Sequence, residues 1–219
     1  MRRPAQTARA VPEENAMQAP QLLNDIPHMG GLDDSPRGRV LRAAAHLFCT
    51  QGYERTTVRD LARVVGIQSG SLFHHFKTKQ DILHAVMEEG IRYNLAGMEA
   101  LVTQGLPARE TLLGLIRAEL ESINGDTGDA MSVLVHQWTA LEPPNQARLL
   151  ELRERYEKLW LDVISQLKKE GLVQYDPFLW RRLLFGAISW TGMWYQRGGS
   201  LSLDDLAAMT LDMALRQKN

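Results

Sequence analysis

The stretch over residues 69–76 brings together side chains that could bond to bases and phosphates. At about 100° per residue, its apolar residues Leu72 and Phe76 share one face of a helix. The opposite face then holds only small or hydrogen-bonding residues, namely Gly70, Ser71 and His74. Serine and imidazole groups suit the base edges of a nucleic acid, and no acid on this face repels phosphate. The pattern favours a nucleic-acid contact, although His74 taken alone is better explained as a surface histidine of no function.

Capping signals define the helices that must position this stretch. Thr57 with Asp60 forms a capping box that opens a short helix, and Thr78 with Asp81 forms another that opens a long one. A three-residue turn beginning at Gly66 joins two short helices, which predicts a helix-turn-helix over residues 57–76. His74 and His75 point about 100° apart on a helix, so the pair is not expected to hold one metal ion.

Charge is distributed unevenly along the chain. Residues 35–85 carry eight basic and three acidic residues, whereas the whole chain has a formal net charge of −1. A compact basic module joined to an acidic body suggests that the module meets a polyanion. A chance fluctuation of a solvated surface would give the same charge pattern, so charge alone leaves both interpretations open.

The spacing of apolar residues predicts an all-α protein. Residues 1–34 are rich in proline and lack aromatic residues, which indicates a disordered N-terminal arm. Beyond them apolar residues recur every three or four positions without sustained strand alternation. The punctuation by Pro, Gly and capping residues predicts about nine helices, the later ones over 79–104, 107–124, 129–141, 143–169, 177–196 and 202–216.

Several classes of protein are not expected. The single cysteine, Cys49, excludes a disulfide framework and any multi-cysteine zinc site. No run of 18 apolar residues and no secretory signal occurs, so we expect a cytoplasmic protein without a membrane association. No nucleophile–base constellation, carboxylate cluster or phosphate-cradling loop is evident. The chain is therefore not expected to be an enzyme or to carry a metal or cofactor.

The residues of the basic module closely resemble the DNA-binding domain of TetR-family transcriptional regulators, over 56–62, 65–67 and 70–83. The resemblance implies an N-terminal three-helix DNA-binding domain at 35–95 and a C-terminal helical ligand-binding and dimerisation domain at 96–219. It implies that a homodimer binds double-stranded DNA at a pseudo-palindromic operator. It places the DNA contacts on Thr57, Gln68, Ser69, Ser71, His74, His75 and Lys79. Phe73 stands where the family usually has tyrosine, and Gln68 stands where serine or threonine often caps the recognition helix.

The expected helix over 177–196 is apolar around most of its circumference, so it must be covered on more than one side. Residues 190–202 resemble, more loosely, a TetR subgroup that senses acyl-CoA thioesters. The resemblance implies that one side of this helix faces a ligand and the other a second subunit. The residues predicted to contact the ligand are His136, Trp138, Trp190, Met193 and Trp194. For Trp190 and Trp194, packing in a core or a dimer interface remains an equal alternative.

Taken together, the sequence predicts a ligand-released repressor whose small hydrophobic effector belongs to fatty-acid or other acyl-CoA metabolism. Arg117, Arg181 and Arg182 are candidates to contact the phosphates of coenzyme A, although a solvated helix surface is the more common explanation for residues such as Arg181 and Arg182. Two alternatives remain open. One is a partner-controlled or architectural DNA-binding protein without a small ligand, and the other is a multidrug-type sensor.

Overall fold

The computed structural model describes residues 32–215, and within this range the chain contains helices and loops but no strand. The all-α prediction is confirmed. Most of the predicted arm over 1–34 lies outside the described residues, as do residues 216–219. The α-helices are α2 (Pro36–Thr50), α3 (Val58–Val65), α4 (Ser69–Leu72), α5 (Lys79–Val102), α6 (Ala108–Asn124), α7 (Gly128–His136), α8 (Pro143–Lys169), α9 (Pro177–Trp190) and α10 (Leu203–Ala214), with 3₁₀ turns η2 (Trp138–Ala140) and η3 (Thr191–Met193).

Local capping interactions fix where many of the helices begin. The predicted boxes at Thr57 and Thr78 are formed, and Ser202 makes a third at the start of α10. Each box satisfies two backbone N–H groups that a helix start would otherwise leave without partners. Gly66 ends α3 in the left-handed region, with φ 75°, where glycine carries no steric penalty.

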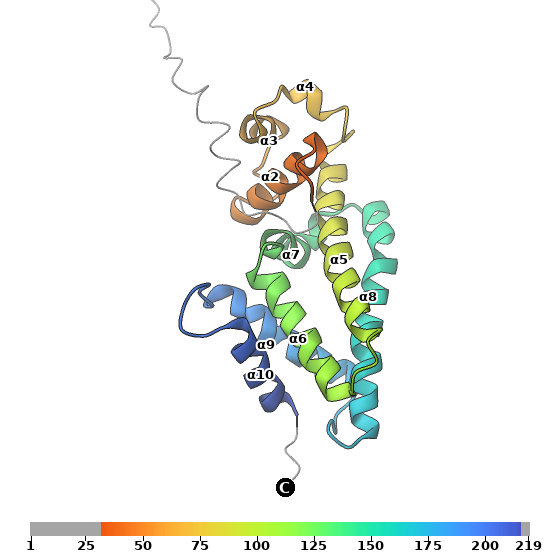
Figure 1. Ribbon diagram of the computed structural model, residues 1–219. Helices are drawn as coiled ribbons and strands as arrows, with labels where there is room; N and C mark the ends of the chain where they lie inside the picture. Colours follow the sequence, from red (N-terminus) through yellow and green to blue (C-terminus); the bar gives the residue numbers. More distant parts are fainter. Residues whose placement is uncertain (1–31, 216–219) are drawn as a thin grey trace, which may run out of the picture.

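The first core lies where α2, α3 and α4 pack around the beginning of α5, at one end of the molecule (Figure 1). Phe48, Leu61 and Leu72 supply one fully buried side chain from each of the three short helices. The same core includes residues of α7, because Gly90 of α5 lets Ala130 approach closely. A Cβ atom at Gly90 would lie 3.2 Å from the Ala130 Cβ atom. The DNA-binding module predicted from the sequence is thus packed directly onto the body of the protein.

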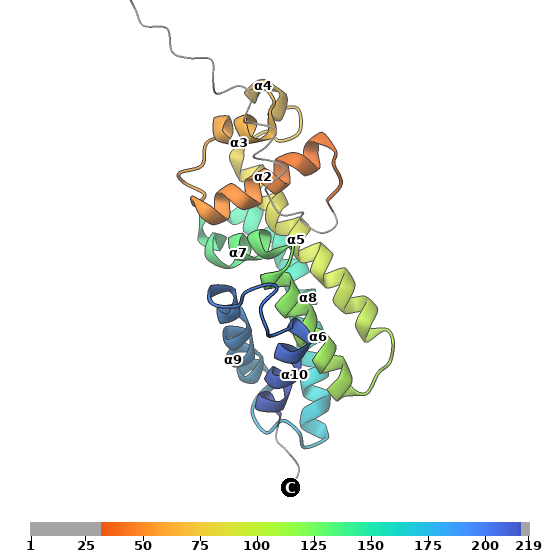
Figure 2. The same ribbon diagram turned by 60° about the vertical axis from the view of Figure 1, so that its left-hand side comes forward.

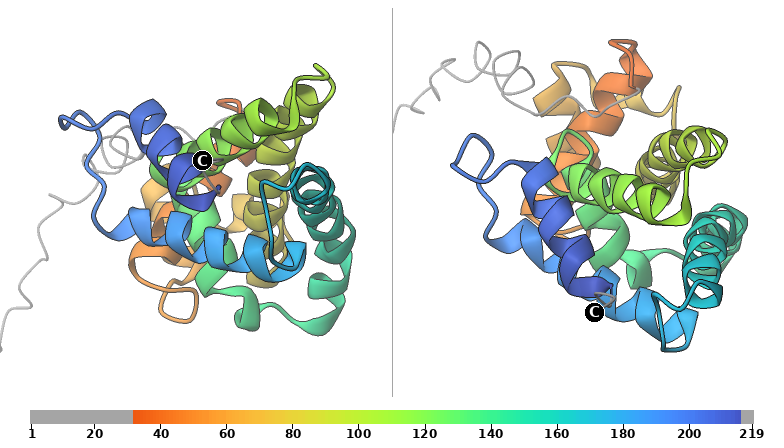
Figure 3. Two further views of the ribbon diagram at one scale, coloured as in Figure 1. Left: turned by 90° about the horizontal axis from the view of Figure 1, so that it is seen from below. Right: turned by 60° about the horizontal axis from the view of Figure 1, so that its bottom comes forward.

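The second core is built by α6, α8, α9 and α10 around the far half of α5 (Figures 1 and 2). Trp160 of α8 is its largest fully buried side chain. Because α5 runs from the first core to the second without a break, it crosses the domain boundary predicted between residues 95 and 96. Seen from below, α9 and α10 both lie against α6 (Figure 3). No helix among the described residues is long and apolar enough to cross a membrane.

Three predicted helices are shorter than the sequence pattern suggested. The helix expected over 69–76 is regular only to Leu72, after which the N–H groups of Phe73, His74 and His75 bond three residues back, as in a 3₁₀ turn. The helix expected over 129–141 gives way to η2 after His136. The helix expected over 177–196 ends at Trp190, where the Thr191 hydroxyl donates to the Ile188 carbonyl at 2.7 Å.

Candidate nucleic-acid interface and effector pocket

The recognition segment presents uncommitted polar side chains to solvent. Gln68 precedes α4 and makes no capping hydrogen bond with its side chain, so its amide remains available. Ser71, His74 and His75 are exposed, and Ser69 is half-buried. A Cβ atom at Gly70 would meet nothing within 4 Å, so a backbone or a base could approach there closely. Three residues per 3₁₀ turn bring Ser71 and His74 onto one side of the segment.

Two of the predicted phosphate contacts serve the fold itself. The Thr57 hydroxyl donates to the Asp60 carboxylate at 2.6 Å and accepts from the Asp60 backbone N–H at 3.2 Å. The Thr57 backbone N–H donates to the same carboxylate oxygen at 3.0 Å, and the two bonds that the carboxylate accepts hold the pKa of Asp60 below its usual value. The Lys79 ammonium donates to the carbonyls of Tyr53 and Thr56, at 2.9 and 3.1 Å. It also lies 4.0 Å from the Tyr53 ring centroid. Lys79 therefore ties the start of α5 to the loop before α3, instead of projecting its charge freely.

Other basic side chains of this module are better placed to meet phosphate. Arg55, Arg59 and Lys77 are exposed, and none of the three forms an ion pair within residues 32–215. All three belong to the basic residues counted over 35–85, but nothing in the local sequence pattern shows that they, and not Lys79, are free of protein partners among the described residues. The difference is that Lys79 finds carbonyl partners from a segment more than 20 positions away.

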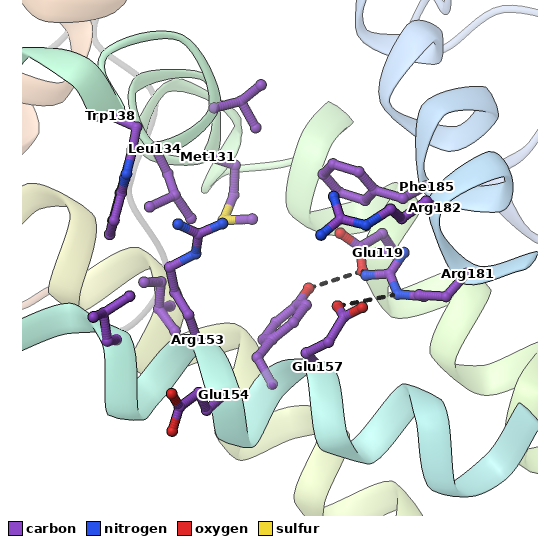
Figure 4. A pocket seen from close by; sticks show the side chains of 14 residues that line it. Glu119, Met131, Leu134, Trp138, Arg153, Glu154, Glu157, Arg181, Arg182 and Phe185 are labelled. Carbon is purple, nitrogen blue, oxygen red and sulfur yellow. Dashed lines mark hydrogen bonds and ion pairs between the residues drawn. The ribbon is translucent and has the colours of Figure 1, made fainter. Parts of the chain in front are cut away.

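A pocket of about 610 Å³ opens into the body between α6, α7, α8 and α9 (Figure 4). Its walls are largely apolar, with a charged cluster at the end near α9 and Trp138 at the other end. Arg153 lies between these ends, with its guanidinium 4.2 Å from the Trp138 ring centroid. The lining residues include Met131, Leu134, Trp138, Tyr156, Arg182 and Phe185.

The charged cluster at the α9 end is centred on a buried carboxylate. Glu119 is fully buried, accepts a hydrogen bond from the Tyr156 hydroxyl at 2.9 Å and pairs with Arg181 at 3.3 Å. Glu157 approaches the same guanidinium at 3.8 Å, and the guanidinium lies over the Trp160 ring at 4.2 Å. Burial raises the pKa of Glu119, and the positive charge of Arg181 opposes that rise.

Of the residues predicted to contact a ligand, Trp138 lines the pocket. His136 is exposed, with Nδ1 2.9 Å from the Ser132 carbonyl oxygen. Trp190, Met193 and Trp194 are 66%, 73% and 49% exposed on the outer surface and do not line the pocket. The geometry of α9 explains this, because Trp190 lies nine residues, or about half a turn in orientation, beyond Arg181, which faces inward.

Among the arginines considered from sequence, Arg181 and Arg182 line the pocket. Arg117 does not, since it pairs with Asp204 and Glu121. Sequence reasoning missed Glu119 and Arg153. A signal existed for Glu119: it falls three and four residues after Ile116 and Leu115, on the apolar face of its helix, where an acid requires a buried partner.

The outer sides of α9 and α10 carry large apolar side chains exposed to solvent. Leu183 is 68% exposed and Met213 is 87% exposed, and Trp190, Met193 and Met209 extend this surface. We call these five residues the α9–α10 surface. Isolated exposed apolar residues are ordinary, but a group on neighbouring helices is typical of a protein–protein interface.

Two family models match the chain. The model described as bacterial regulatory proteins, tetR family, matches residues 40–86, and that described as tetracyclin repressor-like, C-terminal domain, matches residues 105–217. The chain belongs to the TetR family. As a member of this family it is a DNA-binding transcriptional regulator, which confirms the fold and this part of the function predicted from the sequence.

Relatives with known names span most of the chain. The HTH-type transcriptional repressor KstR2 of Mycobacterium tuberculosis is 30% identical over 194 residues, which cover 85% of this chain and 94% of that protein. Its solved structure, described as a ketosteroid transcriptional regulator, covers 87% of this chain and all of that one, with a TM-score of 0.78 and 26% identity. The fatty acid metabolism regulator protein of Bacillus subtilis is 25% identical over 162 residues, 70% of this chain and 79% of its own.

A further solved structure has a different description. The protein described as superantigen PfiT is 52% identical, and the match covers 84% of this chain and 98% of that one, with a TM-score of 0.70. The same architecture therefore occurs in proteins with different descriptions, and the chemistry of the sites must distinguish between functions.

Proposed function

We propose that this TetR-family protein binds a pseudo-palindromic operator as a homodimer and leaves it when an acyl-CoA thioester or similar apolar acyl derivative enters the pocket. The observation that carries the proposal is the pocket itself, whose mostly apolar wall also holds arginines. The same chain presents a solvent-exposed recognition segment. The pocket volume of about 610 Å³ falls in the range of sites that enclose a small organic ligand.

The arginines of the pocket favour an effector with an anionic group. Arg153 and Arg182 lie against aromatic rings, at 4.2 Å from Trp138 and 4.4 Å from Phe178. An arginine held in this way keeps donors available for phosphate or carboxylate oxygens at a reduced entropic cost. The names of two relatives, a fatty acid metabolism regulator and a ketosteroid regulator, support an effector with a large apolar part.

The effector class is tested by displacement from DNA. Acyl-CoAs, free fatty acids and aromatic drugs are titrated against the complex of protein and labelled operator, and release is followed by fluorescence anisotropy. We expect release by members of the acyl-CoA series. Release by the drugs but by no acyl-CoA would contradict the proposed class and would favour a multidrug-type sensor.

DNA recognition by the exposed segment gives a second expected result. Replacing His74 by alanine should weaken specific operator binding by about 1–3 kcal/mol and should change non-specific binding little. Lys77→Ala should weaken binding to all duplexes and reduce the slope of log K against log salt by about 1. Gel-shift titrations at several salt concentrations, with random duplex as control, decide whether any preference for the operator exists.

Lys79→Ala should instead lower the unfolding temperature, because it removes two hydrogen bonds to carbonyls.

A glutamine clamp offers a physical connection between the pocket and the DNA-binding end. The Gln80 amide nitrogen donates to the Ala140 carbonyl at 2.8 Å, and its oxygen accepts from the Glu142 N–H at 3.1 Å. Gln80 lies in the first turn of α5, directly after the recognition segment. Ala140 belongs to η2, which begins at Trp138 of the pocket wall. A ligand that displaces Trp138 would therefore act on the first turn of α5.

Gln80→Ala is expected to uncouple the two sites. Operator affinity without effector, and effector affinity without DNA, should each change less than about threefold. The reduction of operator affinity by effector, ordinarily about 1–3 kcal/mol in such systems, should fall by half or more. The measurement is a complete binding cycle, in which operator affinity is determined with and without effector and effector affinity with and without operator. Gln166→Ala, on the far part of α8, is the control and should keep the wild-type coupling. Undiminished coupling in Gln80→Ala would exclude the clamp as the connection.

A further inference from the structure

We infer that the effector carries a hydroxyl group on its apolar part, and that Glu119 and Arg181 recognise this hydroxyl at the α9 end of the pocket. The inference rests on the proposed function, because it assigns a chemical feature to the ligand of the same pocket. It concerns direct binding to the protein, and can therefore be tested separately from release of DNA.

Three buried polar atoms at this end have no hydrogen-bond partner among the described residues, and one of them, Nε of Arg181, faces the Glu157 carboxylate at 3.8 Å. The other two, which have neither a hydrogen bond nor a facing carboxylate, are Oε1 of Glu119 and Nη1 of Arg181, on side chains that are 0% and 4% exposed. Both residues line the pocket, opposite Trp138 (Figure 4). The other oxygen of Glu119 already accepts from Tyr156 and Arg181. The cluster therefore leaves one acceptor and one donor unused beside the pocket.

Leaving a buried acceptor or donor without a partner destabilises the site, and more so where the group is charged. A ligand that supplies partners for both atoms recovers this free energy when it binds. A hydroxyl group can do so, since its O–H donates to Glu119 while its oxygen, or a neighbouring one, accepts from Arg181.

Other ligand groups fit the same atoms less well. A carbonyl oxygen accepts from Arg181, but it supplies no donor to Glu119. A carboxylate would place a second negative charge beside Glu119, and an alkyl group would leave both polar atoms unpaired. A site built to bond a hydroxyl discriminates strongly against an analogue that lacks it, because the polar groups of the site are then buried unpaired.

The test is a matched series that differs only in the polar group. Dodecanoyl-CoA is compared with its hydroxy and oxo derivatives, substituted either next to the thioester or at the chain end, by isothermal titration calorimetry without DNA. One hydroxy isomer should bind at least about tenfold more tightly than the unsubstituted thioester. The same isomer should also bind several-fold more tightly than its oxo counterpart.

Glu119→Gln supplies a second, independent readout. The two donors from Tyr156 and Arg181 should hold the amide oxygen in place, which leaves the amide N–H₂ toward the ligand. The preference for hydroxy over oxo should then shrink or reverse, because a carbonyl oxygen now meets a donor. Glu110→Gln, at an exposed position of the same helix, should keep the wild-type preference.

The outcomes separate the two proposals. Equal binding of hydroxy and unsubstituted members would overturn the hydroxyl inference and leave the proposed effector class intact. Failure of every thioester to bind would overturn both. If Glu119→Gln does not fold, the wild-type series alone still decides, because it requires the hydroxy member to exceed both the oxo and the unsubstituted member.

Discussion

Leu183→Glu is expected to convert the protein to a monomer that no longer binds its operator. Leu183 is 68% exposed on α9 within the α9–α10 surface, whose other members are Trp190, Met193, Met209 and Met213. In a two-fold dimer one substitution buries two carboxylates, one from each subunit, and each costs several kcal/mol without a partner. A monomer presents only one recognition segment, so operator affinity should fall by about 100-fold or more.

Light scattering at micromolar concentration measures the oligomeric state, and anisotropy with labelled operator measures DNA binding on the same samples. Tyr93→Glu is the matched control, because Tyr93 is a large exposed side chain on α5, outside the α9–α10 surface. It should leave the dimer and the operator affinity unchanged. A wild-type protein that is monomeric in this range, or a Leu183→Glu protein that remains a dimer, would show that this surface does not join two subunits.

Arg181→Leu is expected to destabilise the fold by about 3–5 kcal/mol, because it leaves the Glu119 carboxylate buried without its counter-ion. The Tyr156 hydroxyl would remain as the only hydrogen-bond donor to Glu119 described for this cluster. Denaturation by urea gives the free energy of unfolding. The double variant Glu119→Leu, Arg181→Leu should recover much of the loss, since an apolar pair requires no charge compensation. A loss as large in the double variant as in the single one would mean that packing, and not charge, is responsible.

The loss of folding stability in Arg181→Leu should depend on pH, because the pKa of Glu119 is raised. A carboxyl group whose folded-state pKa exceeds its unfolded value binds more protons in the folded state, so its contribution to stability decreases as pH rises between the two values. Burial already raises the pKa of Glu119 above 4.5, and removal of Arg181 should raise it further. The deficit of Arg181→Leu relative to the wild type should therefore be larger near pH 8 than near pH 5. A deficit that is independent of pH would contradict an ionised Glu119.

Much of the DNA-binding module could be predicted from the sequence, because short-range interactions determine it. The boxes at Thr57 and Thr78 and the turn at Gly66 each depend on residues within four positions of one another. The end of the recognition segment could not be placed in this way. Phe76 is buried in the first core, and α5 begins only three residues later, so the segment tightens into a 3₁₀ turn before a full helix can form.

The role of Lys79 shows the same limit for a single side chain. The sequence shows a cation beside a helix start, which is consistent with a phosphate contact. Only the fold brings the Tyr53 and Thr56 carbonyls within hydrogen-bond distance of its ammonium. Hydrogen-bond partners supplied by distant segments have no periodicity in the sequence, so local patterns cannot reveal them.

By itself, the sequence determined the helical class, the helix starts and the family, since these depend on apolar periodicity and on capping within one turn. The tertiary structure alone decided which residues face the pocket. Trp190 and Arg181 lie on the same apolar helix, yet one is exposed and the other is buried against Glu119. The orientation of α9 against α6 and α8 makes that choice, because a helix that is apolar on most sides carries no local signal for the side that will be covered.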